Sequence, residues 1–377
     1  MRKIILTALT AVSAFFIIQS CSKSGSTPTG GGGGDKGNSF DRKAMITNIS
    51  TNIILPAYTQ YLTVTTNLDA AVAAFNTAPD AAKLTTLQAA FKTAYEQWQS
   101  TSAFDFGPAE PISLRANTNT FPTNVNQINA NVTAGSYNPN LLVNLSAKGF
   151  PAIDYLLFGT GTDNTAILAQ YTTDALAANR KKHLAELSAE LKTNATTILA
   201  AWNGAYKTTF LNADGTDVGS STGQLVNQLI QDYENLKNLE IGIPAGVQSL
   251  GTTFPTKVQA YYSKQSAKLV LLHIQAVQNI YLGKSAAGDG LGLDDYLVKA
   301  NATYTDGKPL NDVIKAQFTT AIAKLNVLTD PLSDNIKNNN GQVTAAYTEL
   351  QKLTVLLKTD MTSKLGIAIT FGDNDGD

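Results

Sequence analysis

The sequence predicts an all-α fold built from two tandem domains that each resemble a four-helix bundle. Apolar residues recur every three or four positions along most of the chain, which is the spacing of one face of an α-helix. The apolar–polar alternation of a half-buried strand is sparse. At 377 residues the chain is longer than one typical core, which favours two domains.

The first twenty residues are typical of a secretory signal peptide. The basic start MRK is followed by the apolar run IILTALTAVSAFFII and by a small residue, Ser20. Cys21 is the only cysteine, and the sequence I-Q-S-C that it completes resembles the lipidation box of bacterial lipoproteins. Acyl chains on Cys21 would anchor the protein to a membrane rather than span it. Residues 21–39 contain five consecutive glycines and are predicted to form a lipidated, flexible tether.

From about Phe40 onward, the chain is predicted to form amphipathic helices. The clearest apolar stripes lie at residues 84–98, 176–202, 225–236, 269–280 and 314–325. Proline fixes φ and lacks an N–H, so four prolines are expected where helices begin, kink or end. These are Pro56, Pro79, Pro244 and Pro331. The polar segment 203–223 is predicted to be a loop between two helical bundle domains, residues 40–210 and 211–377.

Composition and charge exclude two classes of protein. Hydrophobic residues make up 43% and charged residues 15%, which is typical of a globular chain rather than a disordered one. The formal net charge of -1 leaves no basic field for nucleic acid, so no nucleic-acid partner is expected.

Two ten-residue segments indicate an internal duplication. GFPAIDYLLF at 149–158 aligns with GLGLDDYLVK at 290–299, and the alignment pairs Gly149 with Gly290 and Asp154 with Asp295. Duplication predicts that both segments form short helices in equivalent positions, each entered through a glycine turn. Chance similarity is the alternative, because the matching residue types are common.

Several segments together resemble one known family. Trp98, FDFGPAE (104–110), LRANTNTFP (114–122), GFPAIDYLLFG (149–159) and the closing ITFGDNDGD (369–377) are similar to imelysin-like proteins, and in particular to the lipoprotein branch found in Bacteroidetes. The resemblance covers the chain from about residue 40. It implies a fold of two packed four-helix bundles and a role in iron uptake, with peptidase activity assigned to the founding member.

The hallmark of that family, G-x-H-x-x-E, is degenerate in this chain. Gly149, Pro151 and Asp154 stand at its three positions. A histidine and a glutamate three residues apart on a helix can hold one metal ion, but proline offers no ligand atom. Asp154 is either a remaining ligand or a residue of the helix start. Any ion held there, or at Asp295 in the second copy, would have to be bound by oxygens alone.

The two histidines do not replace the missing ligand. His183 precedes Glu186 by three residues, yet both are expected at exposed or boundary positions of their helix. His273 lies in the apolar segment LVLLHIQAV and is expected to be a hydrogen-bonded core residue. No H-E-x-x-H sequence is present.

A polar cluster in the first half is the other candidate site. Its residues are Asp105, Glu110, Arg115, Asn117 and Asn119, and it is expected to lie next to the Gly149 turn. Arg115 can bridge a carboxylate with two hydrogen bonds, as an internal staple or as an anion receptor, and the staple is the preferred interpretation. Irregular segments between long helices are where a bundle protein places a binding site.

These observations lead to one functional hypothesis and two alternatives. The hypothesis is an envelope-anchored, imelysin-like binding lipoprotein, connected by resemblance with iron uptake and without hydrolytic activity. The alternatives are a metallopeptidase with a carboxylate-only metal site and a structural or partner-binding lipoprotein. No cofactor motif is present, and iron is the one candidate. The expected partners are a membrane, reached through the lipid anchor, and iron, an iron-bearing ligand or an envelope protein. The expected location is the bacterial envelope, at the periplasmic or outer-surface face of the outer membrane.

Overall fold

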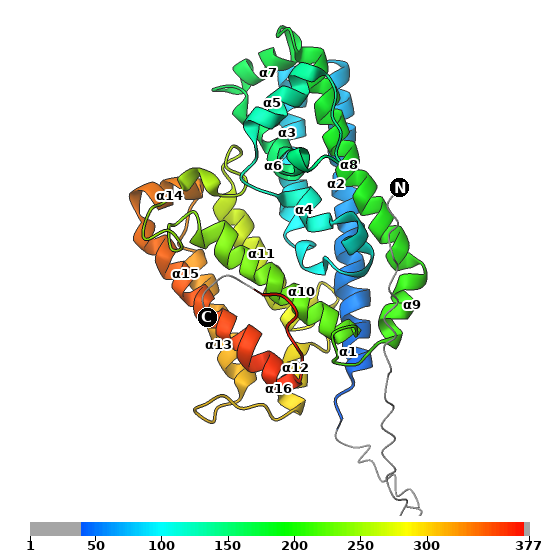
Figure 1. Ribbon diagram of the computed structural model, residues 1–377, viewed down its shortest axis with the longest axis vertical. Helices are drawn as coiled ribbons and strands as arrows, with labels where there is room; N and C mark the ends of the chain where they lie inside the picture. The colour runs from blue at the N-terminus through cyan, green and yellow to red at the C-terminus, as the bar shows by residue number, and fades with distance from the viewer. Residues whose placement is uncertain (1–38, 373–377) are drawn as a thin grey trace, which may run out of the picture. The chain divides into compact units, whose positions relative to one another are not determined.

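The structure, a computed structural model, describes residues 39–372. The predicted signal peptide, Cys21 and all of the tether except Ser39 lie outside this range. Residues from Phe40 onward form one compact unit, shown in Figure 1. The all-α prediction is confirmed: the only strands of the described residues are β1 (Lys284–Ser285) and β2 (Gly288–Asp289), which form one antiparallel hairpin. No helix within residues 39–372 combines the length and the apolar character needed to cross a membrane.

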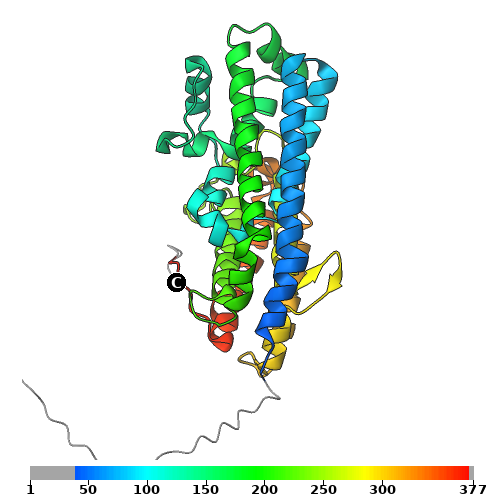
Figure 2. The same cartoon turned by 90° about the vertical axis from the view of Figure 1, so that its right-hand side faces the viewer.

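The first group of helices is organised around its three longest members. In chain order the group contains α1 (Arg42–Asn48), η1 (Ile49–Ile54), α2 (Leu55–Thr77), α3 (Ala81–Trp98), η2 (Ser102–Phe104), η3 (Gly107–Ile112), α4 (Leu114–Asn119), α5 (Val125–Ala134), η4 (Leu142–Ala147), α6 (Gly149–Asp154), η5 (Tyr155–Gly159), α7 (Asn164–Thr172), α8 (Ala177–Asn203) and α9 (Ala205–Asn212). The η elements are short 3-10 or π-helices. Helix α2 packs along both α3 and α8, and Figures 1 and 2 show α2 and α8 side by side. The shorter α6 covers the α3 and α8 side of this bundle.

The second group of helices follows residue 220. It contains α10 (Ser221–Asn235), η6 (Leu236–Gly242), η7 (Pro255–Lys257), α11 (Ser266–Tyr281), α12 (Leu293–Lys299), α13 (Leu310–Leu325), α14 (Leu332–Asn338), α15 (Asn340–Thr354), η8 (Val355–Met361) and α16 (Thr362–Leu365). Helix α13 packs against α11 and α15, and α10 continues without a break into the π-helix η6, which packs on α11 and α15. A π-helical turn within a long helix is rare and often marks a functional region.

The predicted helices are confirmed, with one correction at the proposed boundary. All five apolar stripes lie on helices, namely α3, α8, α10 with η6, α11 and α13, and the four prolines stand at helix starts or just beyond helix ends. Segment 203–223 is not only a loop, because it contains α9. Phe210 of α9 is buried against Trp202 and Phe106. The polar residues that flank Phe210 in the sequence gave no indication of this aromatic packing. The division into two domains near residue 210 and the internal duplication stay predictions.

The two groups of helices meet along one contact, which we call the seam. Here α10 packs against η2, and α11 packs against α3. The segment 258–265, between η7 and α11, also faces α6 of the first group, as its hydrogen bonds to Asp154 show. The seam therefore brings together irregular segments from both groups, and it contains the candidate site.

Candidate functional site

Five charged side chains meet in the interior of the seam. Asp105 and Arg115 come from the first group, on either side of η3, and Asp232, Glu240 and His273 come from α10, η6 and α11 of the second group. Asp232, Glu240 and His273 are almost completely buried. Buried charges are tolerated only when they are paired and hydrogen-bonded, so the geometry of these pairs decides what the site can do.

His273 lies between two carboxylates. Its Nε2 is 2.7 Å from Oδ2 of Asp232, and its Nδ1 is 2.9 Å from Oε1 of Glu240. Burial lowers the pKa of His273, but the two carboxylates outweigh it and raise this pKa to about 10. Burial raises the pKa of Asp232, but the charge and hydrogen bond of His273, the charge of Arg115 and the hydrogen bond of Ser102 together outweigh burial, so this pKa lies below its usual range. His273 is therefore an imidazolium that donates both ring N–H groups. The expectation of a hydrogen-bonded core histidine is confirmed.

Arg115 connects the cluster to the first group of helices. Its guanidinium lies 3.4 Å from Oδ1 of Asp232 and 3.7 Å from Oδ2 of Asp105. It also donates hydrogen bonds to the carbonyl oxygen of Ser102 and to Oε1 of Gln228. Burial raises the pKa of Asp105, and Arg115 opposes that rise. The two hydrogen bonds join Ser102 of the first group to Gln228 of the second, which supports the interpretation of Arg115 as a staple, while its buried Nε makes no hydrogen bond within the described residues.

The cluster has the outline of a serine–histidine–carboxylate triad, but its protonation does not suit that chemistry. Oγ of Ser102 lies 3.4 Å from Nε2 of His273, and Glu240 contacts the opposite ring nitrogen. A general base needs a free nitrogen lone pair to accept the serine proton. His273 has none while it is an imidazolium, and Ser102 donates its own proton to Oδ2 of Asp232 at 3.0 Å. In this protonation state Ser102 is not activated as a nucleophile.

A small cavity lies beside the cluster, and we call it the Glu240 cavity. It has a volume of about 40 Å³. Its walls are formed by Trp98, Gln99, Ser102, Arg115, Asn119, Phe121, Asp232, Asn235, Leu239, Glu240 and His273. One carboxylate oxygen of Glu240, Oε2, is buried and has no hydrogen-bond partner among the described residues.

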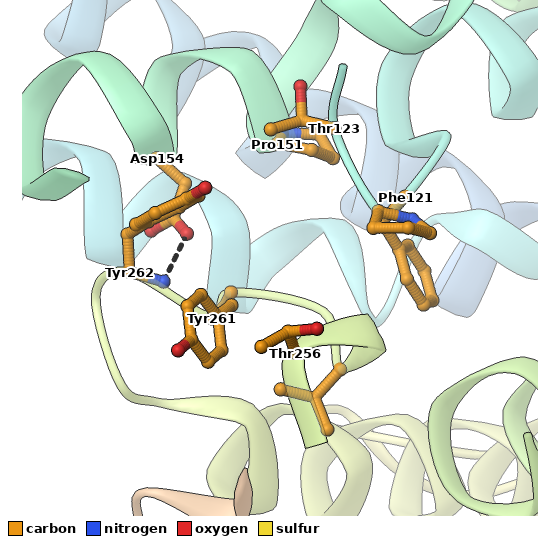
Figure 3. A pocket seen from close by; sticks show the side chains of 10 residues that line it. Phe121, Thr123, Pro151, Asp154, Thr256, Tyr261 and Tyr262 are labelled. Carbon is orange, nitrogen blue, oxygen red and sulfur yellow. Dashed lines mark hydrogen bonds between the residues drawn. The ribbon is translucent and has the colours of Figure 1, made fainter. Parts of the chain in front are cut away.

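A larger hollow shares Phe121 with the Glu240 cavity, and we call it the Asp154 pocket. It has a volume of about 220 Å³. Its lining residues are Phe121, Pro122, Thr123, Pro151, Asp154, Thr256, Val258, Ala260, Tyr261 and Tyr262. Figure 3 shows Pro151 and Asp154 of α6 on one side of this pocket and Thr256 and Tyr261 on the other, with Phe121 at its edge. Two residues of the degenerate motif thus line this pocket.

Both oxygens of Asp154 hold the opposite wall of this pocket. They accept hydrogen bonds from the backbone N–H groups of Tyr262 and Ser263, each at 2.9 Å. These donors lie between Ala260 and Lys264, which both have positive φ, a conformation that is strained for residues other than glycine. Burial raises the pKa of Asp154 to about 6, although the two N–H groups favour its charged form. Asp154 is therefore a structural carboxylate that maintains the pocket, and it ends α6 instead of beginning it.

Gly149 places α6 in contact with α4. Its φ is +67°, and a Cβ atom on it would lie 2.1 Å from the carbonyl oxygen of Thr118. Only glycine fits this close approach. Pro151 lies in the first turn of α6, as predicted, where its missing N–H removes no helical hydrogen bond. The predicted proximity of the polar cluster and the Gly149 turn is thus explained by the contact between α4 and α6.

The remaining candidate residues have separate structural roles. Glu110 is exposed on η3 and does not join the charge cluster. Asn117 donates to the carbonyl oxygen of Ile112, while Asn119 links Tyr95 to Gln259 across the seam. Asp295 accepts from the backbone N–H of Gly292 in the first turn of α12. Both α6 and α12 are short helices, as the duplication predicts. However, Asp295 accepts from a residue 3 positions away in the sequence, whereas Asp154 accepts from residues 108 and 109 positions away.

The donor groups do not suit a resident metal ion. Within residues 39–372, no three His, Cys, Asp or Glu side chains are placed to hold one ion. Pro151 supplies no ligand atom, and Asp154 already accepts from two N–H groups. The nitrogen atoms of His273 face two different carboxylates on opposite sides of the ring. We therefore derive no metal-dependent step at this site.

His183 differs from its expected exposed or boundary position. It is 2% exposed, because Tyr137, from the segment after α5, packs its ring against the imidazole at 5.0 Å. Burial lowers the pKa of His183 to about 4, so this ring is neutral. Glu186 remains partly exposed, and its Oε2 lies 3.9 Å from Nδ1 of His183. The apolar stripe of α8 did not reveal the additional cover that α5 and its following segment provide.

Sequence reasoning missed Ser102, Asp232 and Glu240. Asp232 and Glu240 are spaced along α10 and η6 between apolar residues, and no motif distinguishes them from solvated carboxylates. One usable signal was the presence of two acidic residues on a segment that also carries a strong apolar face, opposite a histidine in another apolar helix.

Comparison with known proteins gives a consistent assignment. The family model described as imelysin, peptidase M75, matches residues 54–357. A relative from Synechococcus elongatus named iron-regulated protein A is 23% identical over 317 residues, which cover 80% of this chain and 81% of the relative. The crystal structure of a proposed iron-regulated protein A precursor from Parabacteroides distasonis superposes with a TM-score of 0.70 at 18% identity, over 86% of this chain and 95% of that chain. An imelysin-like protein from Psychrobacter arcticum gives a TM-score of 0.66 at 18% identity, over 88% and 97% of the two chains. The structural similarity at this identity supports the fold alone.

Proposed function

Since this chain belongs to the imelysin family, we propose that it is a binding protein of the bacterial cell envelope that takes part in iron uptake and does not hydrolyse its ligand. The observation that carries this proposal is the Asp154 pocket. It is an opening of about 220 Å³ at the seam, with aromatic walls and a carboxylate that stabilises one of them. A concave, largely preformed site between two packed groups of helices is where a bundle protein binds a small ligand.

The role in iron uptake is supported by the relative in Synechococcus elongatus. Its name, iron-regulated protein A, describes that protein as regulated by iron. Iron enters our proposal as cargo, either as the ion or within a larger iron-bearing ligand. The larger ligand is favoured, because the side chains of the described residues do not form a set of metal ligands.

The envelope location is supported by the N-terminal sequence. A signal peptide followed by Cys21 and a glycine-rich tether would leave the folded unit attached to a membrane through acyl chains on Cys21. The folded unit begins at Phe40, whose ring stacks on Tyr296 at 4.6 Å. The tether would therefore end close to that contact.

The absence of hydrolysis is supported by the state of His273. A histidine with a pKa of about 10 is protonated at neutral pH and cannot remove a proton from Ser102. Purified full-length protein incubated with an unfolded polypeptide should leave it intact. Cleavage that a chelator abolishes would instead favour the metallopeptidase with a carboxylate-only site.

Growth under iron limitation tests both the role in iron uptake and the assignment of the ligand site to the Asp154 pocket. A strain that lacks the gene should grow poorly in iron-limited medium, and the wild-type gene should restore growth. Thr256 is exposed at the Asp154 pocket, so Thr256→Trp should fill the pocket without disturbing the core and should fail to restore growth. Thr209→Trp is the matched control, because Thr209 is exposed on α9 away from the pocket, and it should restore growth.

Two results would contradict this proposal. Normal growth of the deletion strain in iron-limited medium would favour a structural or partner-binding lipoprotein. Full restoration by Thr256→Trp would show that the ligand binds somewhere other than the Asp154 pocket.

A further inference from the structure

The Glu240 cavity contains an unused hydrogen-bond acceptor of unusual strength. Oε2 of Glu240 has no partner among the described residues, and the whole side chain is only 4% exposed. A buried carboxylate oxygen without a partner is destabilising by more than a neutral group would be. Glu240 lines the cavity, so a ligand donor located there would supply the missing hydrogen bond.

The charges around the cavity favour a positively charged occupant. The cluster contains three carboxylates, on Asp105, Asp232 and Glu240, but only two cations, on Arg115 and His273. Arg115 is paired with Asp105 and Asp232, and both N–H groups of His273 are used by Asp232 and Glu240. Neither cation is therefore directed at Oε2 of Glu240, and one additional positive charge would balance the cluster.

The size and the walls of the cavity select among cations. Its volume of about 40 Å³ exceeds the roughly 10–15 Å³ that one water molecule needs, so a small cationic group fits there. Trp98 and Phe121 supply aromatic surface, which attracts a cation, and Gln99 and Asn235 add side-chain amides. An ammonium group has three donors for such acceptors, whereas a hard metal ion requires six or more oxygen ligands in most sites.

We infer that the seam binds a ligand carrying a primary ammonium group, and that this group occupies the Glu240 cavity and donates to Oε2 of Glu240. The inference rests on the proposed function, since it takes the seam as the ligand site and adds the chemical class of the ligand. Phe121 lines both the Glu240 cavity and the Asp154 pocket. The body of the ligand occupies the Asp154 pocket, which shares this ring.

Titration with methylammonium chloride tests this inference directly. The purified full-length chain is observed by ¹⁵N NMR of the His273 ring, because Nδ1 of His273 is hydrogen-bonded to the carboxylate of Glu240. Methylammonium should shift this resonance in a saturable manner at constant ionic strength. Methanol, which has a similar size and no charge, and tetramethylammonium, which has no N–H group to donate to Oε2 of Glu240, should not.

Two substitutions place the binding at Glu240. Glu240→Gln keeps an acceptor for His273 and replaces the free oxygen by an N–H₂ donor, so the dissociation constant for methylammonium should rise about 10-fold or more. Asn235→Leu is a second variant that leaves the partners of His273 unchanged, and it should weaken binding in the same direction. Asp289→Asn removes the same charge from the exposed β-hairpin and should have no effect.

The outcomes separate this inference from the proposed function. Absence of a saturable shift or an equal response to methanol would show that the cavity does not select an ammonium group, and unchanged binding in Glu240→Gln would show that the ammonium group binds elsewhere. Each of these results would overturn the inference. If Thr256→Trp nevertheless fails to restore growth under iron limitation, the proposed function stands without the inference on the ammonium group. If methylammonium binds but the deletion strain grows normally in iron-limited medium, the ligand class stands and the role in iron uptake is wrong.

Discussion

Oδ2 of Asp154 lies 2.9 Å from the backbone nitrogen of Tyr262, which is 108 residues further along the chain. Oδ1 of the same carboxylate accepts from Ser263, so one side chain at the end of α6 holds a segment of the second group of helices. That segment forms a wall of the Asp154 pocket. The final residue of the degenerate motif therefore holds one wall of the pocket in place through two backbone hydrogen bonds.

Gly149→Ala should destabilise the protein by about 2–4 kcal/mol. A positive φ costs about 1–2 kcal/mol for an alanine, and the added Cβ would collide with the backbone of α4. Gly341→Ala is the control, because Gly341 lies in the first turn of α15 with open space around it, and alanine there should be neutral or slightly stabilising. Urea unfolding measures both. Equal stability of the two variants would show that α4 and α6 separate easily.

Asp154 should make the stability of the protein fall as the pH rises from about 4 to 6. Its pKa is raised from 3.8 to about 6 in the folded protein, so the folded state keeps a proton that the unfolded state has lost. The contribution is complete below pH 3.8 and is lost as the pH passes 6, which corresponds to about 3 kcal/mol. Asp154→Asn cannot titrate. The free energy of unfolding of the wild type should therefore decrease relative to this variant between pH 4 and 6, and parallel pH profiles would disprove the assignment.

The two histidines should have opposite protonation states in one NMR spectrum at pH 7.5. Burial between two carboxylates raises the pKa of His273 to about 10, whereas burial without such partners lowers that of His183 to about 4. ¹⁵N shifts should show one imidazolium and one neutral ring, and His183→Gln should remove the neutral one. The stabilisation from His273 should be complete below pH 6.5 and be lost as the pH rises through 10. A neutral His273 at pH 7.5 would also restore the general base that our functional proposal excludes.

Zinc should bind the wild-type protein weakly, and Pro151→His should increase its affinity at least about 10-fold. Both positions line the Asp154 pocket, so a histidine at 151 would add a nitrogen ligand to the oxygens of Asp154. Calorimetric titration of both proteins measures the difference, with Thr209→His as a control on the exposed face of α9. Tight wild-type binding that disappears in Asp154→Ala would show that the motif still functions as a metal site.

Much of the fold follows from local sequence patterns, because a helix buries one face and leaves a periodic record of it. The stripes of α3, α8, α10, α11 and α13 and the four prolines are examples. Helix α9 was missed, since its burial depends on the rings of Trp202 and Phe106, from other parts of the chain. His183 was misplaced for the same reason: Tyr137 covers it from a distant segment.

The amino-acid sequence by itself determined the all-α class, the loss of the motif histidine at Pro151 and the pairing of Gly149 with a turn. Each of these depends on one residue type or on short-range spacing. Only the tertiary structure decided which charges meet. Ser102, Asp232, Glu240 and His273 lie on four elements, and their protonation depends on distances of about 3 Å and on exclusion from water. Electrostatic interactions of buried groups are set by position and solvation, and neither is encoded in the local spacing of residues along the chain.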